Sequence, residues 1–221
     1  MLSDLIKTSD LFCCDVPYLK DFFAKAQYPW EMLPKIKDHI KSLIENGLHG
    51  FDEIAPMVFV GKNVSIAPTA VIMAPTIIGD RCEIRPGAYI RGNVITGSDC
   101  VIGNSTEIKN SILLDGVQIP HYNYVGDSIL GNKAHMGAGA VCSNLKADKK
   151  PVVIHGQSHY ETFLKKIGGI LADGADIGCG CVLNPGTVIG KKTSVYPLTS
   201  LRGVYPENSI VKSTKEIVKR V

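Results

Sequence analysis

The sequence lacks long apolar runs and any large excess of one charge. No stretch approaches the roughly 18 apolar residues that a membrane helix needs, and Lys7, Asp10 and Asp15 interrupt any signal-peptide core. The 24 basic and 21 acidic residues leave a net charge of only +3. We therefore expect a cytoplasmic protein that binds neither a membrane nor nucleic acid.

The chain also lacks the composition of a disulfide scaffold. Its seven cysteines are an odd number, scattered through 221 residues, which favours reduced thiols. A composition of 45% hydrophobic and 20% charged residues excludes a disordered chain or a collagen-like fibre. The sequence therefore predicts one sizeable core, or a core with a small appendage.

A six-residue repeat fills most of the chain. Large residues recur at every sixth position, and a small or β-branched residue follows each one by four positions. The large positions, aliphatic except for Thr96, are Val60, Ile66, Ile72, Ile78, Ile84, Ile90, Thr96, Ile102, Ile108 and Leu114, and later Leu171, Ile177, Leu183, Ile189, Val195 and Leu201. Cys82, Cys100 and Cys181 occupy small positions, so we expect them to pack inside the fold. A period of six fits short strands joined by turns, each pointing one large and one small side chain inward.

This pattern resembles the hexapeptide repeat of the left-handed parallel β-helix, an all-β triangular prism with three hexads per coil. The resemblance implies a β-helix over residues 58–206. Residues 1–57 carry the signals of a small helical segment, with Ile36, Ile40, Leu43 and Ile44 on one face. The tail, residues 207–221, predicts a short helix because Ser213 and Glu216 match a capping box.

The repeat breaks twice. Between Leu114 and Leu130 it predicts four inserted residues, within residues 119–127. The second break, about residues 143–170, predicts a loop or hairpin. Because a regular solenoid offers little concavity, we expect chemistry near these interruptions.

A constant coil of eighteen residues places Arg85, Gly103 and His121 in one column, with neighbours about 4.8 Å apart. Gly103 would leave an empty place, so that Arg85 and His121 face each other across roughly 10 Å. Glu107 and Lys109 flank an inward residue and should both point outward beside this column. Imidazole is a natural general base near neutral pH, and arginine suits a phosphate anion.

Four motifs in fixed order carry a closer resemblance. They are Ile84–Ala88, Asn104–Lys109, His121–Asp127 and Met136–Asn144. Together they resemble the acetyltransferase domain of the bifunctional glucosamine-1-phosphate N-acetyltransferase/N-acetylglucosamine-1-phosphate uridylyltransferase family. The resemblance implies a homotrimer with sites between prisms, which transfers an acetyl group from acetyl-CoA to an amino-sugar phosphate.

The same resemblance implies roles for individual residues. His121 matches the general base and Glu107 its support; Arg85 and Lys109 match the phosphate-binding positions, Tyr124 a substrate contact, and Lys150, more loosely, a lysine from the neighbouring subunit. Ala138 lies in the stretch that lines the acetyl-CoA site, where backbone N–H groups of Gly137–Gly139 would stabilise an oxyanion. His135 stands where the family has an asparagine that contacts the sugar.

Two alternatives stay open. The residues before the prism lack a Gly-rich nucleotide loop and are too few for a nucleotide-binding domain, so this chain could instead be a non-catalytic, regulatory β-helix subunit beside a sugar-phosphate nucleotidyltransferase. A zinc hydratase of the γ-carbonic anhydrase type needs three converging imidazoles, and no third ligand has the right spacing to join His121 and His135. We therefore expect no metal site.

Overall fold

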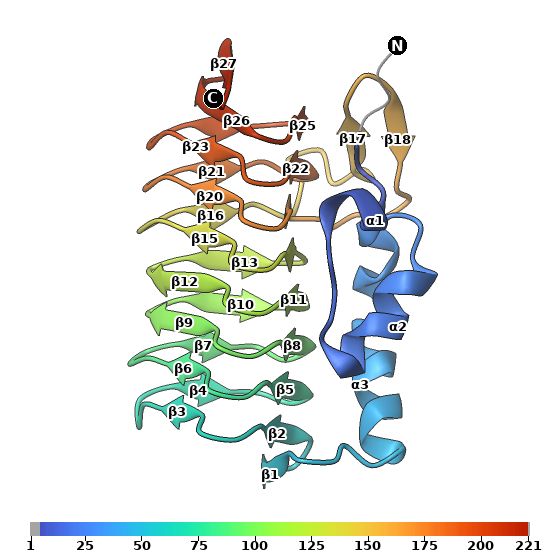
Figure 1. The fold of residues 1–221 in the computed structure, drawn as a ribbon, viewed down its shortest axis with the longest axis vertical. Coiled ribbons are helices and arrows are strands. Elements are labelled where there is room, and N and C mark those ends of the chain that lie inside the picture. Colours follow the sequence, from blue (N-terminus) through green and yellow to red (C-terminus); the bar gives the residue numbers. More distant parts are fainter. Residues whose placement is uncertain (1–4, 221) are drawn as a thin grey trace.

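The computed structural model describes residues 5–220, so the outermost residues of the predicted terminal segments, 1–4 and 221, lie outside the described residues. The chain winds into a column of stacked coils with one short strand per side, flanked by helices (Figure 1). The strands of successive coils pair in parallel and form three long sheets. The predicted left-handed β-helix is confirmed.

The three sheets contain every strand of the column. The first sheet consists of β1 (Asp52–Ala55), β2 (Val58–Val60), β5 (Thr76–Ile78), β8 (Val94–Thr96), β11 (Ser111–Leu113), β14 (Ile129–Leu130), β19 (Gly169–Leu171), β22 (Thr187–Ile189) and β25 (Val204–Tyr205). The second consists of β3 (Ser65–Ile66), β6 (Glu83–Ile84), β9 (Val101–Asn104), β12 (Gln118–His121), β15 (His135–Met136), β20 (Asp176–Ile177), β23 (Ser194–Val195), β26 (Ser209–Ser213) and β27 (Glu216–Lys219). The third consists of β4 (Val71–Ile72), β7 (Tyr89–Ile90), β10 (Glu107–Lys109), β13 (Tyr124–Gly126), β16 (Val141–Cys142), β21 (Val182–Leu183) and β24 (Ser200–Leu201).

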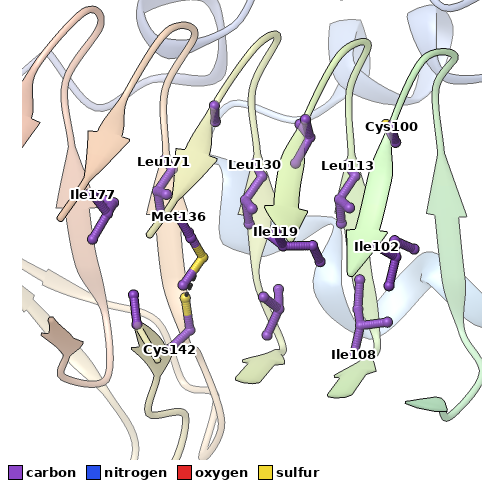
Figure 2. Close-up of a cluster of buried hydrophobic side chains, with 14 of the residues drawn as sticks. Cys100, Ile102, Ile108, Leu113, Ile119, Leu130, Met136, Cys142, Leu171 and Ile177 are labelled. Atoms are coloured by element: carbon purple, nitrogen blue, oxygen red, sulfur yellow. Dashed lines mark hydrogen bonds between the residues drawn. The ribbon is translucent and has the colours of Figure 1, made fainter. Parts of the chain in front are cut away.

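The interior of the column is filled by the residues of the repeat. Large side chains from all three sheets meet along the axis, as Figure 2 shows for Leu130, Ile102 and Ile108, which come from the first, second and third sheets respectively. Cys82 and Cys100 lie in the small inward positions, buried and unpaired, as predicted. Burial of this aliphatic stack is the main source of stability, because each coil covers apolar surface of the next.

The predicted register is wrong at one point. The residue that points inward on β11 is Leu113, not Leu114, because Ile112 pairs with Ile95 only 17 positions earlier. Ile129 pairs with Ile112 at the same spacing, so two successive coils have each lost one residue, both on the side that leads to the first sheet. In a repeat of six residues, the loss of two residues and the gain of four displace the later large positions by the same amount. The four-residue insertion is therefore absent.

The shortened sides turn tightly at Asn110 and Asp127. Both adopt the left-handed backbone region, with φ of 44° and 50°, which asparagine and aspartate tolerate better than other side chains. The new register also removes an irregularity of the repeat, because the small inward positions become Ser111 and Val117 in place of Ile112 and Gln118.

The predicted helical segment is confirmed and covers the first sheet (Figure 1). It consists of α1 (Thr8–Leu11), α2 (Pro17–Lys25), the 3₁₀ turns Pro29–Glu31 and Leu33–Lys35, and α3 (Ile36–Glu45), although β1 also lies within its predicted range. The buried residues Ile36 and Ile40 belong to one cluster with outward residues of the sheet such as Ile95 and Ile112. The first sheet is therefore buried on both faces from β5 to β22. None of the helices in the described part of the chain is long and apolar enough to cross a membrane.

The second break is a hairpin, as predicted. β17 (Val153–His155) and β18 (His159–Glu161) pair antiparallel and project beside the helices, after which the coils resume at β19. The predicted C-terminal helix is wrong: β26 and β27 form an antiparallel hairpin. Ser213 Oγ accepts hydrogen bonds from the N–H groups of Lys215 and Glu216, so the capping signal closes a β-turn instead of a helix.

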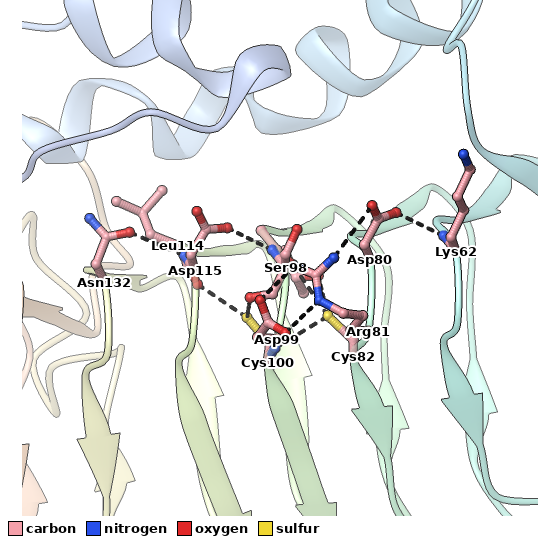
Figure 3. A network of polar contacts seen from close by, with 12 residues as sticks. Lys62, Asp80, Arg81, Cys82, Ser98, Asp99, Cys100, Leu114, Asp115 and Asn132 are labelled. Atoms are coloured by element: carbon pink, nitrogen blue, oxygen red, sulfur yellow. Dashed lines mark hydrogen bonds and ion pairs between the residues drawn. The ribbon is translucent and has the colours of Figure 1, made fainter.

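The corner between the first and second sheets is fixed by a ladder of acidic and amide side chains (Figure 3). Asp80 accepts a hydrogen bond from the N–H of Lys62 at 2.8 Å, and Asp115 accepts one from the N–H of Ser98 at 2.7 Å. Each bond joins one coil to the next. This corner is therefore structural.

Candidate functional site

The residues that the sequence assigned to chemistry gather around the edge between the second and third sheets. His121 ends β12, is exposed, and pairs with Asn104 of the preceding coil. Pro120 is the neighbour of Gly103, and a Cβ on Gly103 would collide with its carbonyl. The predicted column of Arg85, Gly103 and His121 is therefore wrong, because the intervening coil has 17 residues. Arg85 and His121 lie two coils apart in neighbouring columns of this edge.

Arg85, which directly follows β6, is already paired with a residue of that strand. Its Nε and Nη2 donate to the two carboxylate oxygens of Glu83 at 3.0 and 3.1 Å. Hydrogen bonding to the guanidinium lowers the pKa of the Glu83 carboxyl. The pair is partly exposed, and such pairs contribute little to stability, so Arg85 can exchange Glu83 for another partner at little cost.

Asn123 supports the turn that presents His121, and sequence reasoning missed it. Its amide is buried in a small inward position, where Oδ1 accepts from the N–H of His121 at 3.1 Å. Nδ2 donates to the carbonyls of Gly137 and Ala140 in the next coil, at 2.9 and 3.0 Å. Every polar atom of the side chain is thereby used to join two turns of the edge. The sequence did contain a signal for this role, because asparagine stands in an inward position that smaller residues hold in other coils.

The third sheet presents two ion pairs beside this edge. Arg91 Nη1 donates to Glu107 Oε1 at 2.7 Å, so Glu107 is paired with Arg91, and its support of His121 stays a prediction. Lys109 Nζ lies 3.1 Å from Asp127 Oδ2, and both side chains are largely buried. Asp127 also accepts a hydrogen bond from Asn110, which locks the shortened corner.

The Tyr124 side chain lies along the third sheet, over Gly126 of its own strand. Gly126, two residues further, has no side chain, and a Cβ there would meet the Tyr124 hydroxyl and Asn144 Nδ2. Asn144 donates to both the Tyr124 hydroxyl, at 3.2 Å, and Asp127. Burial, followed by the nearby carboxylates, raises the pKa of Tyr124. The phenol therefore keeps its proton, and its O–H remains able to donate to a bound molecule.

The remaining predicted residues spread over more of the surface. His135 faces outward on the second sheet, where Nδ1 lies 2.8 Å from Asp176 Oδ1. Lys150 is exposed in the insertion, before the hairpin. Ala138 is exposed at the His121 edge, one coil further along.

The backbone around Ala138 corrects the predicted oxyanion site. The N–H of Gly137 donates to the carbonyl of Ile177, and that of Gly139 to the carbonyl of His121. Ala138 is left as the residue of this turn whose N–H has no partner among residues 5–220. The His121 ring likewise has no hydrogen bond or ion pair to a described residue.

The candidate site lies along an exposed edge of the column, where His121 and Ala138 are both exposed. Pockets of about 610, 510 and 630 Å³ occur elsewhere, and none is lined by a residue named above for chemistry. Within residues 5–220, no three His, Cys, Asp or Glu side chains are grouped to hold a metal ion.

The fold and this edge define a class. The chain is a left-handed parallel β-helix built from hexapeptide repeats, with an edge that carries an imidazole and a backbone N–H that have no partner among residues 5–220. Comparison with known proteins relates it to the bifunctional protein GlmU, so the resemblance stated from the motifs is confirmed.

Each of the matches covers only part of this chain, of the related protein, or of both. The family model described as the GMPPB C-terminal domain matches residues 72–158. GlmU of Methanococcus maripaludis strain S2 is 32% identical over 207 residues, which cover 90% of this chain and 49% of that protein. GlmU of Methanococcus vannielii is 28% identical over 247 residues, covering 99% and 53%. The chain thus spans about half the length of these curated relatives. The solved N-acyltransferase AntD from Bacillus cereus, in complex with dTDP and coenzyme A, has a TM-score of 0.42 at 20% identity, with 77% of this chain and 90% of that chain covered.

Proposed function

We propose that this chain is a CoA-dependent acyltransferase that transfers an acetyl group from acetyl-CoA to the amine of an amino-sugar phosphate such as glucosamine 1-phosphate. One observation carries the proposal: the His121 ring and the N–H of Ala138, both without a partner in the described part of the chain, lie on adjacent coils of one exposed edge. Adjacent coils are about 4.8 Å apart, a spacing that places a base and an oxyanion donor around one reacting carbonyl. The sequence relationship to GlmU over most of the chain supports the same reaction.

The proposed reaction needs one proton acceptor and one hydrogen-bond donor. The amine nitrogen attacks the thioester carbonyl carbon, a C–N bond forms, and the C–S bond breaks to release the CoA thiolate. His121 accepts the proton that the attacking amine loses, and that proton then neutralises the thiolate. The N–H of Ala138 donates to the oxygen that becomes negative as the carbonyl turns tetrahedral. Asn123 holds both turns in place.

The phosphate of the acceptor is assigned to Arg85 and Lys109, with Tyr124 as a further donor. Both cations are paired with carboxylates, Arg85 with Glu83 and Lys109 with Asp127. Arg85 is the more exposed of the two and exchanges partners more easily. His135 and Lys150 are proposed as additional contacts to the sugar, Lys150 from the neighbouring subunit.

A homotrimer would complete this open edge. The first sheet is covered by the chain's own helices, so contacts between prisms must use the other two sheets. The outward side chains Val71, Tyr89 and Val182 of the third sheet are 53%, 38% and 37% exposed, and Tyr122 at the edge is 61% exposed. Apolar exposure of this kind favours burial against a second copy. Sedimentation analysis of the full chain tests the trimer, and a monomer at micromolar concentration contradicts it.

The enzymatic proposal is tested by thiol release. Acetyl-CoA is mixed with glucosamine 1-phosphate, glucosamine or no acceptor, and the free thiol is measured. His121→Ala should lower turnover by about 10²–10⁴-fold. His49→Ala, at an exposed histidine outside the edge, is the matched control and should leave turnover unchanged. Equal turnover of wild type and His121→Ala removes His121 from the role of base.

A second candidate function is a non-catalytic, regulatory β-helix subunit of a sugar-phosphate nucleotidyltransferase. It is favoured by the paired state of Arg85, Glu107 and Lys109, whose charges are satisfied without a substrate. Absence of thiol release with every amino sugar, together with a change in the rate of an added sugar-phosphate nucleotidyltransferase, would favour this function over acyl transfer.

A further inference from the structure

A cavity of about 610 Å³ lies on the far side of the column from the His121 edge. Its floor is the outer face of the last coils, with Val204, Tyr205 and Pro206. Its walls are residues of the N-terminal segment, including Leu11, and the turn of the inserted hairpin, residues 155–157. The volume lies within the range of small-molecule sites, about 300–1,000 Å³.

The hairpin is seated against the coils by two glycines. Gly186 has φ of 78°, and a Cβ there would meet Val152 and Ile154, which are buried beneath the hairpin. Gly203 has φ of 89°, and its missing side chain makes room for the carbonyl of His155. Because only glycine combines this backbone region with so little space, the wall formed by the hairpin is built into the fold.

The two ends of the cavity differ in charge. At the end beside the hairpin lie Arg202 and His155, and at the other end Lys191, Glu207 and Asp10. Neither Arg202 nor Lys191 forms an ion pair within the described part of the chain. The Asp10 carboxylate is already used, because it accepts a hydrogen bond from the N–H of Lys7.

The hairpin end is a region of positive potential. The pKa of His155 is lowered by burial, and further by His159, Arg202 and Lys146. Arg202 presents its guanidinium at an exposed position, while its backbone N–H donates to the Tyr205 hydroxyl. An anion placed here gains charge-assisted hydrogen bonds from the guanidinium, whose planar fork matches phosphate, and a further hydrogen bond from an imidazole N–H.

We propose that this cavity binds a small phosphorylated molecule with a flat, partly apolar body, whose phosphate lies between Arg202 and His155. The apolar body rests on Val204 and Leu11, and hydroxyl groups at its far end reach Glu207. Arg202 and Glu207 are five positions apart in the chain, so the floor between them is at most about 17 Å long, a length that accommodates a nucleoside monophosphate. The site is independent of the proposed acyl transfer.

Isothermal titration calorimetry on the full chain tests this site with UMP, AMP, glucose 1-phosphate, uridine and inorganic phosphate. We expect at least one phosphate monoester to bind, and uridine to bind at least tenfold more weakly than UMP. Comparison of the two nucleotides with glucose 1-phosphate distinguishes a nucleotide from a sugar phosphate as the source of the phosphate group. Absence of binding by all three monoesters overturns the proposal.

Two substitutions locate the binding. Arg202→Gln should weaken the best monoester by about tenfold or more, because a charged hydrogen bond is lost. Lys62→Gln removes an exposed cation at the opposite end of the column and should leave the affinity unchanged. Equal losses in both variants would show general charge attraction and overturn the site. Binding that survives Arg202→Gln also overturns it, and an unchanged thermal midpoint verifies that this variant is folded.

Discussion

Replacement of Asn123 by alanine tests whether the His121 edge depends on a buried amide. Alanine fits the position, because the same inward column holds Ala140 in the next coil and Thr106 in the preceding one. The change deletes three side-chain hydrogen bonds, one from the N–H of His121 and two to the carbonyls of Gly137 and Ala140. The effect therefore reports on those bonds, with little change in packing.

The expected cost follows from the number of bonds. Each buried hydrogen bond contributes about 0.5–1.5 kcal/mol, so the loss of three costs about 2–4 kcal/mol. For a chain of this size, that lowers the thermal midpoint by about 4–16 °C. Asn123→Asp should cost more, because a carboxylate oxygen would replace the amide N–H₂ group opposite two carbonyl oxygens. Differential scanning calorimetry measures both variants.

The same substitution has a consequence for activity. If the amide holds the His121 turn, Asn123→Ala should lower kcat for acetyl transfer by about tenfold or more while the KM for acetyl-CoA changes little, because misplacement of a base affects the transition state. Asn104→Ala is the matched control on the preceding coil, where the exposed amide bonds only to Ser105 and the Tyr122 hydroxyl. That control should cost less than about 1 kcal/mol. A thermal midpoint and a kcat equal to those of the wild type in Asn123→Ala would refute this reasoning.

Three further predictions concern stability. Gly103→Ala should cost about 3 kcal/mol or more in calorimetry, because its Cβ would meet backbone atoms, whereas Gly139→Ala faces open space at φ of 69° and should cost about 1–2 kcal/mol. Asp127→Ala leaves Lys109 largely buried without its partner and should cost about 3–5 kcal/mol in urea unfolding; a loss below about 1 kcal/mol would contradict the buried pair. Burial lowers the pKa of His39 from 6.5, so the unfolded chain takes up the proton first and stability falls as the pH drops below that value. His39→Gln should flatten this dependence of the thermal midpoint on pH, and an unchanged slope would exclude His39 as its source.

The fold was predictable because the repeat is a local property. Each side of a coil needs one large and one small inward residue, so such residues recur along the chain with a period of six. The sequence also carries a signal that the first sheet is covered. The residue before the large position is apolar on that sheet, as at Ile77, Ile95 and Val188, whereas the second sheet has Glu83 and Asp176 at the equivalent position.

The candidate site was predictable in its members but not in their contacts. Because the pattern repeats every six residues, a loss of two residues and a gain of four produce the same spacing in the sequence. The structure has the loss of two, which places His121 in the column next to that of Arg85. Pairing of Glu107 with Arg91 and of Lys109 with Asp127 depends on distances across coils, which no spacing in the sequence reports. The tail shows the same limit, because Ser213 and Glu216 serve a helix cap and a β-turn equally well.

By itself, the sequence determined the architecture of this protein: a helical segment, a three-sided column and a hairpin inserted near its C-terminal end. The tertiary structure decided which side chains are free to act, since it paired Arg85, Glu107 and Lys109 and left His121 unpartnered among the described residues. The physical reason is that packing periodicity is repeated in every coil, whereas hydrogen bonds and ion pairs depend on the exact length of each coil.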